Sequence, residues 1–563
     1  MRASTEGLVT RSDIARLAGV NRPAVTNWAR RHEDFPRPVG SVRTSTGTAD
    51  TFRVSDVGAW LAAKRIPVGG LRAGEPEGTT YGDRFMASLG IGPRTRPQPV
   101  LTRILDALRG ENTAESALDL LIALTYTVAA LPPGELPISG NAWWTVRQTL
   151  AADGVDAAHF GVSSDERRWQ ERSADFAFHA LAAEGWDRDT TIEAFDWLVE
   201  QRSGVEGRHG SDLVTPRAVR RLMSELLPVV GDGGDSGPPF GSDAGEAVPG
   251  DVGVGAILDP FCRTGEMLDA CVATVRERTP ETKLSLRGLS GGEGDAALAR
   301  MRLTLRDVPH TVDVSDFWWP EAEQRYAGVV SNPPFNKRAE DLYRYEHSFR
   351  YGLPPRHNGN FAWLQLAVSA LAPGGRAAVL MPNIAAQSAN PAERAIRAAM
   401  VEDGVVEALV ALPPQLFGKA TGIPVTLWLL RSPTGTPGDV LFVDGAALGT
   451  MTDRVRRVLS ETDIATIVDV CRRWRSARDS GKAFPGQDGF SASVSPGDLA
   501  ARDWLLSPVL HVSSGSPDAV ADAAAQVGRL IDDLARREEQ AYEADMRAGR
   551  MLSELAREVG WKG

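Results

Sequence analysis

One tetrapeptide carries the sharpest chemical signal in this sequence. Residues 326–331 read YAGVVS, which predicts a strand, and Asn332, Pro333, Pro334 and Phe335 follow at once. The amino nitrogen of an aromatic base is a poor nucleophile because its lone pair is delocalised into the ring. Acceptors for its two N–H groups, such as the Asn332 side-chain oxygen and the Pro333 carbonyl, favour a pyramidal nitrogen that attacks an electrophile. The prolines fix the backbone beforehand, and Phe335 offers a stacking face for an extruded base.

The tetrapeptide alone also fits an ordinary loop, so its context matters. About seventy residues upstream, AILDPFCRTGEMLDA predicts a strand, an acidic turn, a loop of small residues and a helix. The charged end of a cofactor fits such a helix N-terminus. Asp259, followed by Pro260, is placed to accept a hydrogen bond from an ammonium group, while Thr264 and Gly265 let the backbone approach. Cys262 has no base beside it and is interpreted as a packing residue.

Apolar strands alternate with amphipathic helices around these motifs. This alternation predicts a multidomain α/β protein whose central domain is Rossmann-like, with a mostly parallel, doubly wound sheet. Ligands of such sheets bind beyond the carboxyl ends of the strands. The strands are predicted at residues 256–261, 284–290, 326–332, 375–383, 405–413, 423–431 and 439–445.

The N-terminal residues predict a winged helix-turn-helix over residues 1–66. SDIARLAG and RPAVTNWARR read as two helices around a tight turn, with Ser12 as the first N-cap and Pro23 in the first turn of the second helix. TFRVSDVGAWLAAK then predicts a wing strand and a closing helix. The outward face of the second helix is polar and basic, which suits DNA, although a solvated helical hairpin is the alternative. This predicted DNA-binding face holds Arg22, Thr26, Asn27, Arg30 and Arg31.

Four further segments complete the predicted organisation. Residues 67–100 are rich in Gly, Pro and Thr and predict a linker, and residues 101–210 predict a helical domain. The α/β domain is expected over 211–445, with a Gly-rich linker or insertion at 229–255. Residues 446–563 predict a helical C-terminal region that docks on partners or DNA, because its last part carries an interrupted apolar stripe.

Composition narrows the class of protein. The 563 residues are 42% hydrophobic and 24% charged, as in packed globular proteins, and the net charge of −11 excludes a uniformly basic nucleic-acid binder. Residues 1–70 nevertheless hold eleven Lys and Arg against six Asp and Glu. The three cysteines lack paired spacing, which predicts a cytoplasmic protein. The histidines are isolated, so no metal site is expected. No apolar stretch is long enough for a membrane helix, so no membrane partner is expected.

Taken in order, the motifs of the chain resemble the gamma-class DNA adenine-N6 methyltransferases, in particular the modification subunits of type I restriction-modification systems. The resemblance runs from about Asp212 to about Asp444, and residues 489–512 also resemble the segment that follows in that family. It rests on LVTPRAVRRLMSELL, LDPFCRTGEML, LRGLSGGEGDAALARMRL, SNPPF, GNFAWLQLAVSALAPGGRAAVLMPN and ALPPQLFGKATGIPVTLWLLR.

The resemblance implies S-adenosylmethionine as cofactor, adenine in double-stranded DNA as substrate, and a separate specificity subunit as partner. A restriction or defence subunit is a further partner that it leaves open. It also implies that Thr215 and Pro216 line the cofactor pocket and that Asp316 is the acidic position near cofactor and adenine. Lys337 and Arg338, just beyond the tetrapeptide, are expected to contact DNA.

Several positions depart from the family pattern, among them Ala327 and Gly328 in place of the usual Phe-Asp before the fourth strand. Arg263 and Thr264 stand where the family loop has Gly and Ser, and Ser290 stands where it has the acid that holds the ribose hydroxyls, with Glu293 three residues later. If the family Gly has a positive φ, Arg263 either bears a backbone cost or reshapes the turn. The sequence therefore leaves two hypotheses: an adenine-N6 methyltransferase of a restriction-modification or phage-defence system, or a catalytically impaired relative that binds DNA or regulates through its helix-turn-helix.

Overall fold

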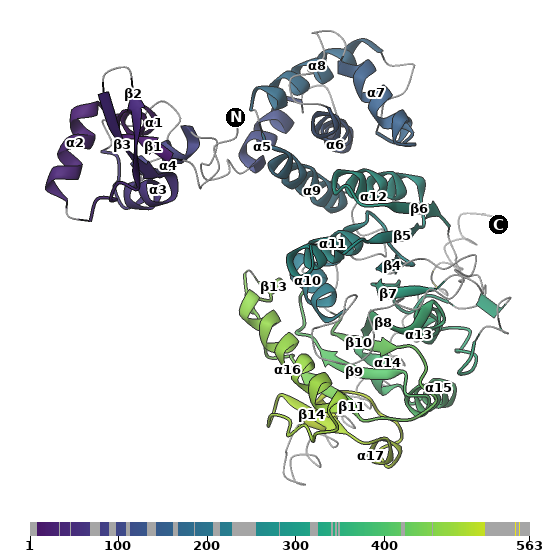
Figure 1. The fold of residues 1–563 in the computed structure, drawn as a ribbon. Coiled ribbons are helices and arrows are strands. Elements are labelled where there is room, and N and C mark those ends of the chain that lie inside the picture. The colour runs from purple at the N-terminus through teal and green to yellow at the C-terminus, as the bar shows by residue number, and fades with distance from the viewer. Residues whose placement is uncertain are drawn as a thin grey trace, which may run out of the picture. The chain divides into compact units, whose positions relative to one another are not determined.

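The structure is a computed structural model that divides into two compact units, Met1–Val205 and Glu206–Gly563. It describes residues 8–512, 547 and 551, with gaps at 33, 45–46, 68–78, 89–96, 109–112, 132–141, 161–166, 185, 206–213, 228–254, 281, 316–324, 339–341, 344–345, 347–348, 418–422 and 453. The helices and strands of both units are labelled in Figure 1. No helix of the described part is long and apolar enough to cross a membrane.

The N-terminal part of the first unit combines four helices with a three-stranded antiparallel sheet of order β1-β3-β2. One shared core includes Ile14, Val25 and Leu61. The elements are β1 (Leu8–Thr10), α1 (Arg11–Ala18), α2 (Arg22–Arg31), β2 (Gly40–Thr44), β3 (Gly47–Arg53), α3 (Val54–Ala62) and α4 (Tyr81–Ser88).

Two details of this part correct the sequence predictions. The N-cap of α1 is Thr10 and not Ser12, because Thr10 is extended and exchanges hydrogen bonds with Asp13 in a capping box. Helix α4 lies inside the predicted linker, and its Phe85 is buried in the shared core. A Cβ on Gly82 would come within 2.6 Å of the Ala62 backbone, so this glycine permits the close packing of α4 on α3.

The rest of the first unit is helical, and α6 lies at its centre. Residues Ala117–Thr127 of α6 are buried, and a mostly buried ion pair joins this helix to α9, with 2.6 Å between Arg202 Nε and Asp119 Oδ1. The elements are α5 (Pro97–Leu108), α6 (Ala114–Ala130), α7 (Ala142–Ala152), the 3-10 turn η2 (Ala157–Phe160), α8 (Arg167–Ala183) and α9 (Arg188–Val205).

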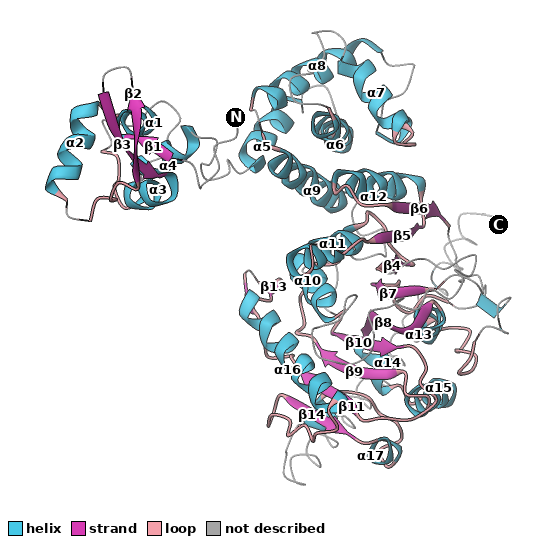
Figure 2. Cartoon of the chain, viewed as in Figure 1, coloured by secondary structure: helices cyan, strands magenta, loops and turns pink. Residues whose placement is uncertain are grey.

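The second unit is built on a nine-stranded mixed sheet of order β14-β11-β9-β10-β8-β7-β4-β5-β6 (Figure 2). Five strand pairs are parallel, while β10 runs antiparallel to both β8 and β9 and β14 runs antiparallel to β11. All seven predicted strands are present. The strands are β4 (Ala256–Asp259), β5 (Ser285–Ser290), β6 (His310–Val314), β7 (Tyr326–Ser331), β8 (Leu371–Pro382), β9 (Val406–Ala411), β10 (Val425–Arg431), β11 (Val440–Asp444) and β14 (Ser491–Val494).

Helices cover both faces of this sheet, as Figure 1 shows. Alternate residues of the central strands face opposite cores, so Val330 packs toward the first layer and Val329 toward the second. The first layer is α10 (Arg217–Leu226), α11 (Glu266–Arg278), α12 (Glu293–Leu305) and α16 (Glu461–Asp479). The second is α13 (Asn360–Ser369), α14 (Asn383–Gln387), α15 (Pro391–Glu402), α17 (Pro496–Ala500) and α18 (Val509–Val512).

Described residues between 446 and 512 pack with this sheet and its layers, and docking of the region 446–563 on partners or DNA stays a prediction. A small antiparallel pair, β12 (Thr450–Met451) and β13 (Arg457–Val458), leads into α16. Ile464, Ile467 and Trp474 of α16 are buried against the sheet. The residues of the apolar stripe predicted in the tail lie outside the described residues: Val520, Val527, Ile531, Leu534, Leu552, Leu555 and Val559.

A buried charge cluster fastens α16 to the sheet. Glu407 of β9 is 1% exposed and pairs with Arg376 of β8 and with Arg475 and Arg478 of α16, at 3.3, 2.8 and 2.9 Å. Burial by itself raises the pKa of Glu407, but the three guanidinium groups hold this pKa well below its usual range. The carboxylate is therefore ionised and fully paired.

We expect Glu407→Gln to lower the free energy of unfolding by about 3 kcal/mol, because it leaves three arginines around a neutral amide. The stabilisation should be complete above the unfolded pKa of about 4.3 and should be lost as the pH falls from there toward the lowered folded pKa. Urea unfolding at several pH values measures both effects. Asp469→Asn, which removes a carboxylate from an exposed pair with Arg473, is the matched control and should change stability by less than about 0.5 kcal/mol. Equal losses in the two variants would contradict the assignment.

Candidate functional site

Three predicted site residues meet at one edge of the large sheet. Strand β4 lies between β5 and β7 and runs parallel to both, so Asp259, Ser290 and Asn332 follow neighbouring carboxyl ends. The chain runs from β4 through β5 to β6 on one side and then returns to β7 on the other side. This reversal makes the edge a topological switch point, where ligands of doubly wound sheets bind.

The Asp259 side chain is buried, and one of its two oxygens accepts a hydrogen bond from the protein. Its Oδ1 accepts the Phe261 N–H at 3.0 Å, whereas its buried Oδ2 has no hydrogen-bond partner. Burial, together with the charge of Glu266, raises the pKa of Asp259 well above its usual range. An unpartnered carboxylate oxygen at a strand end is costly unless a ligand donates to it. The geometry fits the predicted bond to an ammonium group.

The loop after Asp259 leads into α11 and approaches α12 closely. Pro260 is buried, and Arg263 takes φ 46°, the left-handed region that glycine adopts most easily. Gly265 has φ 77°, and a Cβ there would lie 3.2 Å from both Cα and Cβ of Ala299. Gly265 is also the N-cap of α11 and provides no side-chain cap, so the first N–H groups of the helix are left for other acceptors.

A buried ion pair that sequence reasoning missed supports this loop. The Thr264 hydroxyl donates to Glu266 at 2.7 Å, and Arg302 of α12 donates both to the Thr264 carbonyl and, at 3.1 Å, to its hydroxyl. Burial opposes ionisation of Glu266, yet Arg302, Arg220 and Arg263 bring its pKa below the usual value. The Thr264 side chain is thus part of the support. The sequence feature that could have indicated this ion pair was Arg302, a charged residue on an otherwise apolar helix face.

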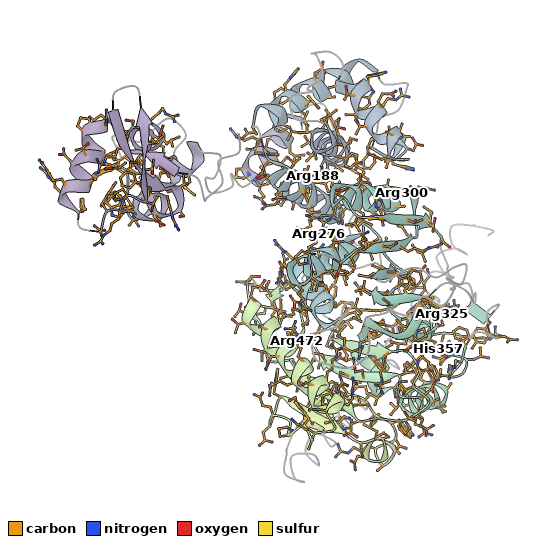
Figure 3. All side chains as sticks on the ribbon, viewed as in Figure 1. Arg188, Arg276, Arg300, Arg325, His357 and Arg472 are labelled. Atoms are coloured by element: carbon orange, nitrogen blue, oxygen red, sulfur yellow. The ribbon has the colours of Figure 1, made fainter. Side chains whose placement is uncertain are left out.

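Ser290, which stands where the family has the acid that holds the ribose hydroxyls, is the last residue of β5. Ser290 is buried, and its hydroxyl lies 3.4 Å from the Gly292 carbonyl. Glu293, the nearest acid along the chain, begins α12 and lies 3.6 Å from Arg300, which is labelled in Figure 3. Asp316 lies outside the described residues, so its predicted role stays a prediction.

The predicted catalytic turn lies beside the start of α10. Asn332 Nδ2 donates to Thr215 Oγ1 at 3.0 Å, and Pro216, which follows Thr215, is the N-cap of α10. Pro333 is buried. Phe335 is half-buried and packs against the core of the first helical layer. The structure therefore joins a residue predicted for the cofactor pocket to the residue predicted for catalysis.

Helix α13 holds the other side of the same turn, and sequence reasoning missed this role. Trp363 Nε1 donates to the Pro334 carbonyl at 3.0 Å, and the Trp363 ring meets Phe261 of the cofactor loop edge-on at 5.0 Å. Buried Asn360 accepts the Asn336 N–H and donates to its side chain, at 3.0 and 2.9 Å. The Asn and Trp in the otherwise apolar stretch NFAWLQLAV were the available signal.

Beyond the turn, Lys337 and Arg338 are exposed, as DNA contact requires. The aromatic residues described in this loop act as anchors. Tyr343 donates its hydroxyl to the Pro354 carbonyl, and Tyr351 donates its hydroxyl to Asp403. The loop therefore offers cations to a ligand, while these rings fix its course.

Other predicted features can be placed as well. The predicted DNA face is exposed along α2, from Arg22 to Arg31. Cys262 is buried in the core, and burial raises its thiol pKa well above the usual value, which suits packing. Within the described part of the chain, no group of three His, Cys, Asp or Glu residues is arranged to hold a metal ion.

Two methylase subunits of type I restriction enzymes are similar to this chain in sequence. The chain is 26% identical to the HindI methylase subunit, a type I restriction enzyme subunit of Haemophilus influenzae, over 59% of this chain and 70% of that protein. It is 28% identical to the MjaIX methylase subunit of Methanocaldococcus jannaschii, over 58% of this chain. It spans only 56% of that second relative's length.

Solved structures share the fold. The methyltransferase subunit of a type I restriction-modification system from Streptococcus thermophilus superposes with a TM-score of 0.55 at 17% identity, covering 74% of this chain and 98% of that chain. A chain from a type I system studied for complex assembly gives a TM-score of 0.52 at 16% identity, covering 84% of this chain and 100% of that chain.

The family model of the N-6 DNA methylases matches residues 186–518, more than half of the chain. This match spans α10, the loop after β4, the turn after β7 and the strands that carry them. It confirms the resemblance found in the sequence motifs: the chain belongs to the N-6 DNA methylase family.

Proposed function

We propose that this chain transfers a methyl group from S-adenosylmethionine to N6 of adenine in double-stranded DNA, as the modification subunit of a restriction-modification or phage-defence system. The observation that carries the proposal is the acceptor-bearing turn at Asn332, fixed beside an unpartnered buried carboxylate at a switch point. The family match and the type I methylase subunits among its relatives support the same chemistry.

In this proposal one group of site residues binds the cofactor and another binds the adenine base. S-adenosylmethionine supplies an electrophilic sulfonium methyl group when bound. Asp259 would accept a hydrogen bond from its ammonium group, and the uncapped start of α11 would be available to its charged end. Asn332 Oδ1 and the Pro333 carbonyl accept the two amino hydrogens of the adenine, so that the nitrogen lone pair points at the methyl group. Phe335 stacks on the base once it has left the duplex.

A catalytically impaired scaffold is not favoured. Arg263 adopts the left-handed backbone that a glycine would adopt, so the departure from the family pattern keeps the course of the loop. The cost of this conformation is about 1–2 kcal/mol, and the Coulomb attraction between Arg263 and buried Glu266 offsets part of it. Asp259 and Asn332 both retain the environment that the chemistry needs.

DNA and partner subunits are recognised outside this site in the proposal. The N-terminal part acts as a winged helix-turn-helix, in which α2 presents Arg22, Thr26, Asn27, Arg30 and Arg31 to DNA. Lys337 and Arg338 contact phosphates near the extruded adenine. In the proposal a specificity subunit selects the sequence and a restriction or defence subunit joins the complex; the relatives are named as methylase subunits of type I restriction enzymes.

Asn332→Ala tests the function directly. It removes one acceptor for the amino hydrogens and leaves the cofactor loop intact, so the single-turnover rate of methyl transfer should fall about 10²- to 10³-fold while cofactor affinity stays unchanged. Transfer of labelled methyl groups to duplex DNA, with the co-expressed partner subunits present, gives the rate. Phe335→Ala should be partly rescued by a mismatch opposite the adenine, which lowers the cost of extrusion, whereas Asn332→Ala should not. Full activity of Asn332→Ala would refute the proposed site.

Asp259 predicts a pH-dependent cofactor affinity. Because burial raises its pKa in the free protein, the carboxyl must lose a proton before it pairs with an ammonium group. Affinity should therefore weaken as the pH falls below this raised pKa, by up to about tenfold per pH unit. Calorimetric titration with S-adenosylmethionine at several pH values should reveal this slope in the native chain and a flat, weaker affinity in Asp259→Asn. The same slope in both proteins would exclude Asp259 as the partner.

The N-terminal face makes a separate prediction. Replacing Arg22, Arg30 and Arg31 together by Ala should weaken DNA binding and reduce the slope of log affinity against log salt by about one for each phosphate that the helix no longer neutralises. Fluorescence anisotropy with labelled duplex at several salt concentrations measures the slope. Cofactor affinity serves as the control and should not change. An unaltered slope would assign this helix to protein contacts.

A further inference from the structure

The hydrogen bond between Asn332 and Thr215 joins two residues 117 positions apart in the sequence. A side-chain amide has a donor end and an acceptor end of nearly the same shape, so packing alone does not decide which end faces a substrate. In this structure the donor end, Nδ2, lies 3.0 Å from Thr215 Oγ1. The acceptor end, Oδ1, is consequently turned away from Thr215.

Thr215 holds its end of this hydrogen bond at a fixed place. Its side chain is 2% exposed and β-branched, which limits the positions that the hydroxyl can take. It immediately precedes Pro216, whose carbonyl accepts the Arg220 N–H in the first turn of α10. Helix α10 is fastened to the sheet by the buried side chains of Val219, Leu222 and Met223. The hydroxyl therefore has a fixed place.

The backbone of the catalytic turn is held independently of Thr215. Trp363 binds the Pro334 carbonyl, Asn360 binds Asn336, and the Gly359 N–H donates to the Lys337 carbonyl at 2.8 Å. These contacts come from α13 and its N-cap in the opposite helical layer. They fix the path of the main chain beyond Asn332.

We infer that Thr215 is a positioning residue for methyl transfer: its hydroxyl accepts from Asn332 Nδ2, so that Oδ1 is the end presented to the amino group of the base. This inference rests on the proposed function. It gives Thr215 a role different from lining the cofactor pocket, which is what the family resemblance implies. The two roles make different kinetic predictions, because one acts on the rate of transfer and the other on cofactor affinity.

The test compares Thr215→Val, which keeps the shape and removes the acceptor, with Thr215→Ser, which keeps the hydroxyl. At saturating cofactor and DNA, with partner subunits present, Thr215→Val should lower the transfer rate about tenfold, as expected when one neutral hydrogen bond is removed, while Thr215→Ser restores most of it. Cofactor affinity, measured by calorimetry, should stay within about twofold. Thr274→Val is the matched control, because it removes a buried hydroxyl of α11 that pairs with Ser224 of α10, and it should leave the rate unchanged.

A double-variant cycle shows whether Thr215 acts through Asn332. The variant carrying both Thr215→Val and Asn332→Ala should be no slower than Asn332→Ala alone, because the amide that Thr215 orients is already gone. A further tenfold loss in the double variant, or a parallel loss of cofactor affinity with an unchanged saturated rate, would overturn the inference. Full activity of Asn332→Ala would instead refute the proposed catalytic turn, so the two failures are distinguishable.

Discussion

The site depends on one constraint: a short stretch of backbone, residues 332–337, is fixed from both sides of a sheet. Thr215, just before α10 in one helical layer, binds the Asn332 side chain, and α13 in the other layer binds the backbone beyond it. A turn at the end of a strand has few contacts of its own. Because both layers hold it, its acceptors are oriented in the free protein, which would keep the cost of reorganisation low in the proposed reaction.

The buried carboxyl groups of the second unit considered above are of two kinds: two are paired with arginines, and one has an oxygen without a partner. Glu407 is surrounded by three arginines, and Glu266 lies against Arg302 below the cofactor loop, so both carboxylates are neutralised within the protein. Asp259 differs, because one of its buried oxygens has no partner. The paired carboxylates stabilise the fold. The unpartnered Asp259 oxygen at the sheet edge is instead available to accept a hydrogen bond from the proposed cationic ligand.

The arrangement of the elements brings the turn after β7 and the loop after β4 together. The Trp363 ring contacts Phe261 and its indole N–H binds Pro334, so one side chain touches both motifs. The switch point brings β4 and β7 side by side although about seventy residues separate them in the sequence.

The sequence by itself determined the seven predicted strands, the family, and the position of Asp259 and Asn332 at strand ends, because apolar runs and proline-rich turns are local signals. Only the tertiary structure decided that α4 packs on α3, that α16 and β14 complete the sheet unit, and that Thr215, Trp363 and Asn360 hold the turn. These features are contacts between distant segments. Their residues have ordinary local patterns, and their roles arise from which side chains the fold places together.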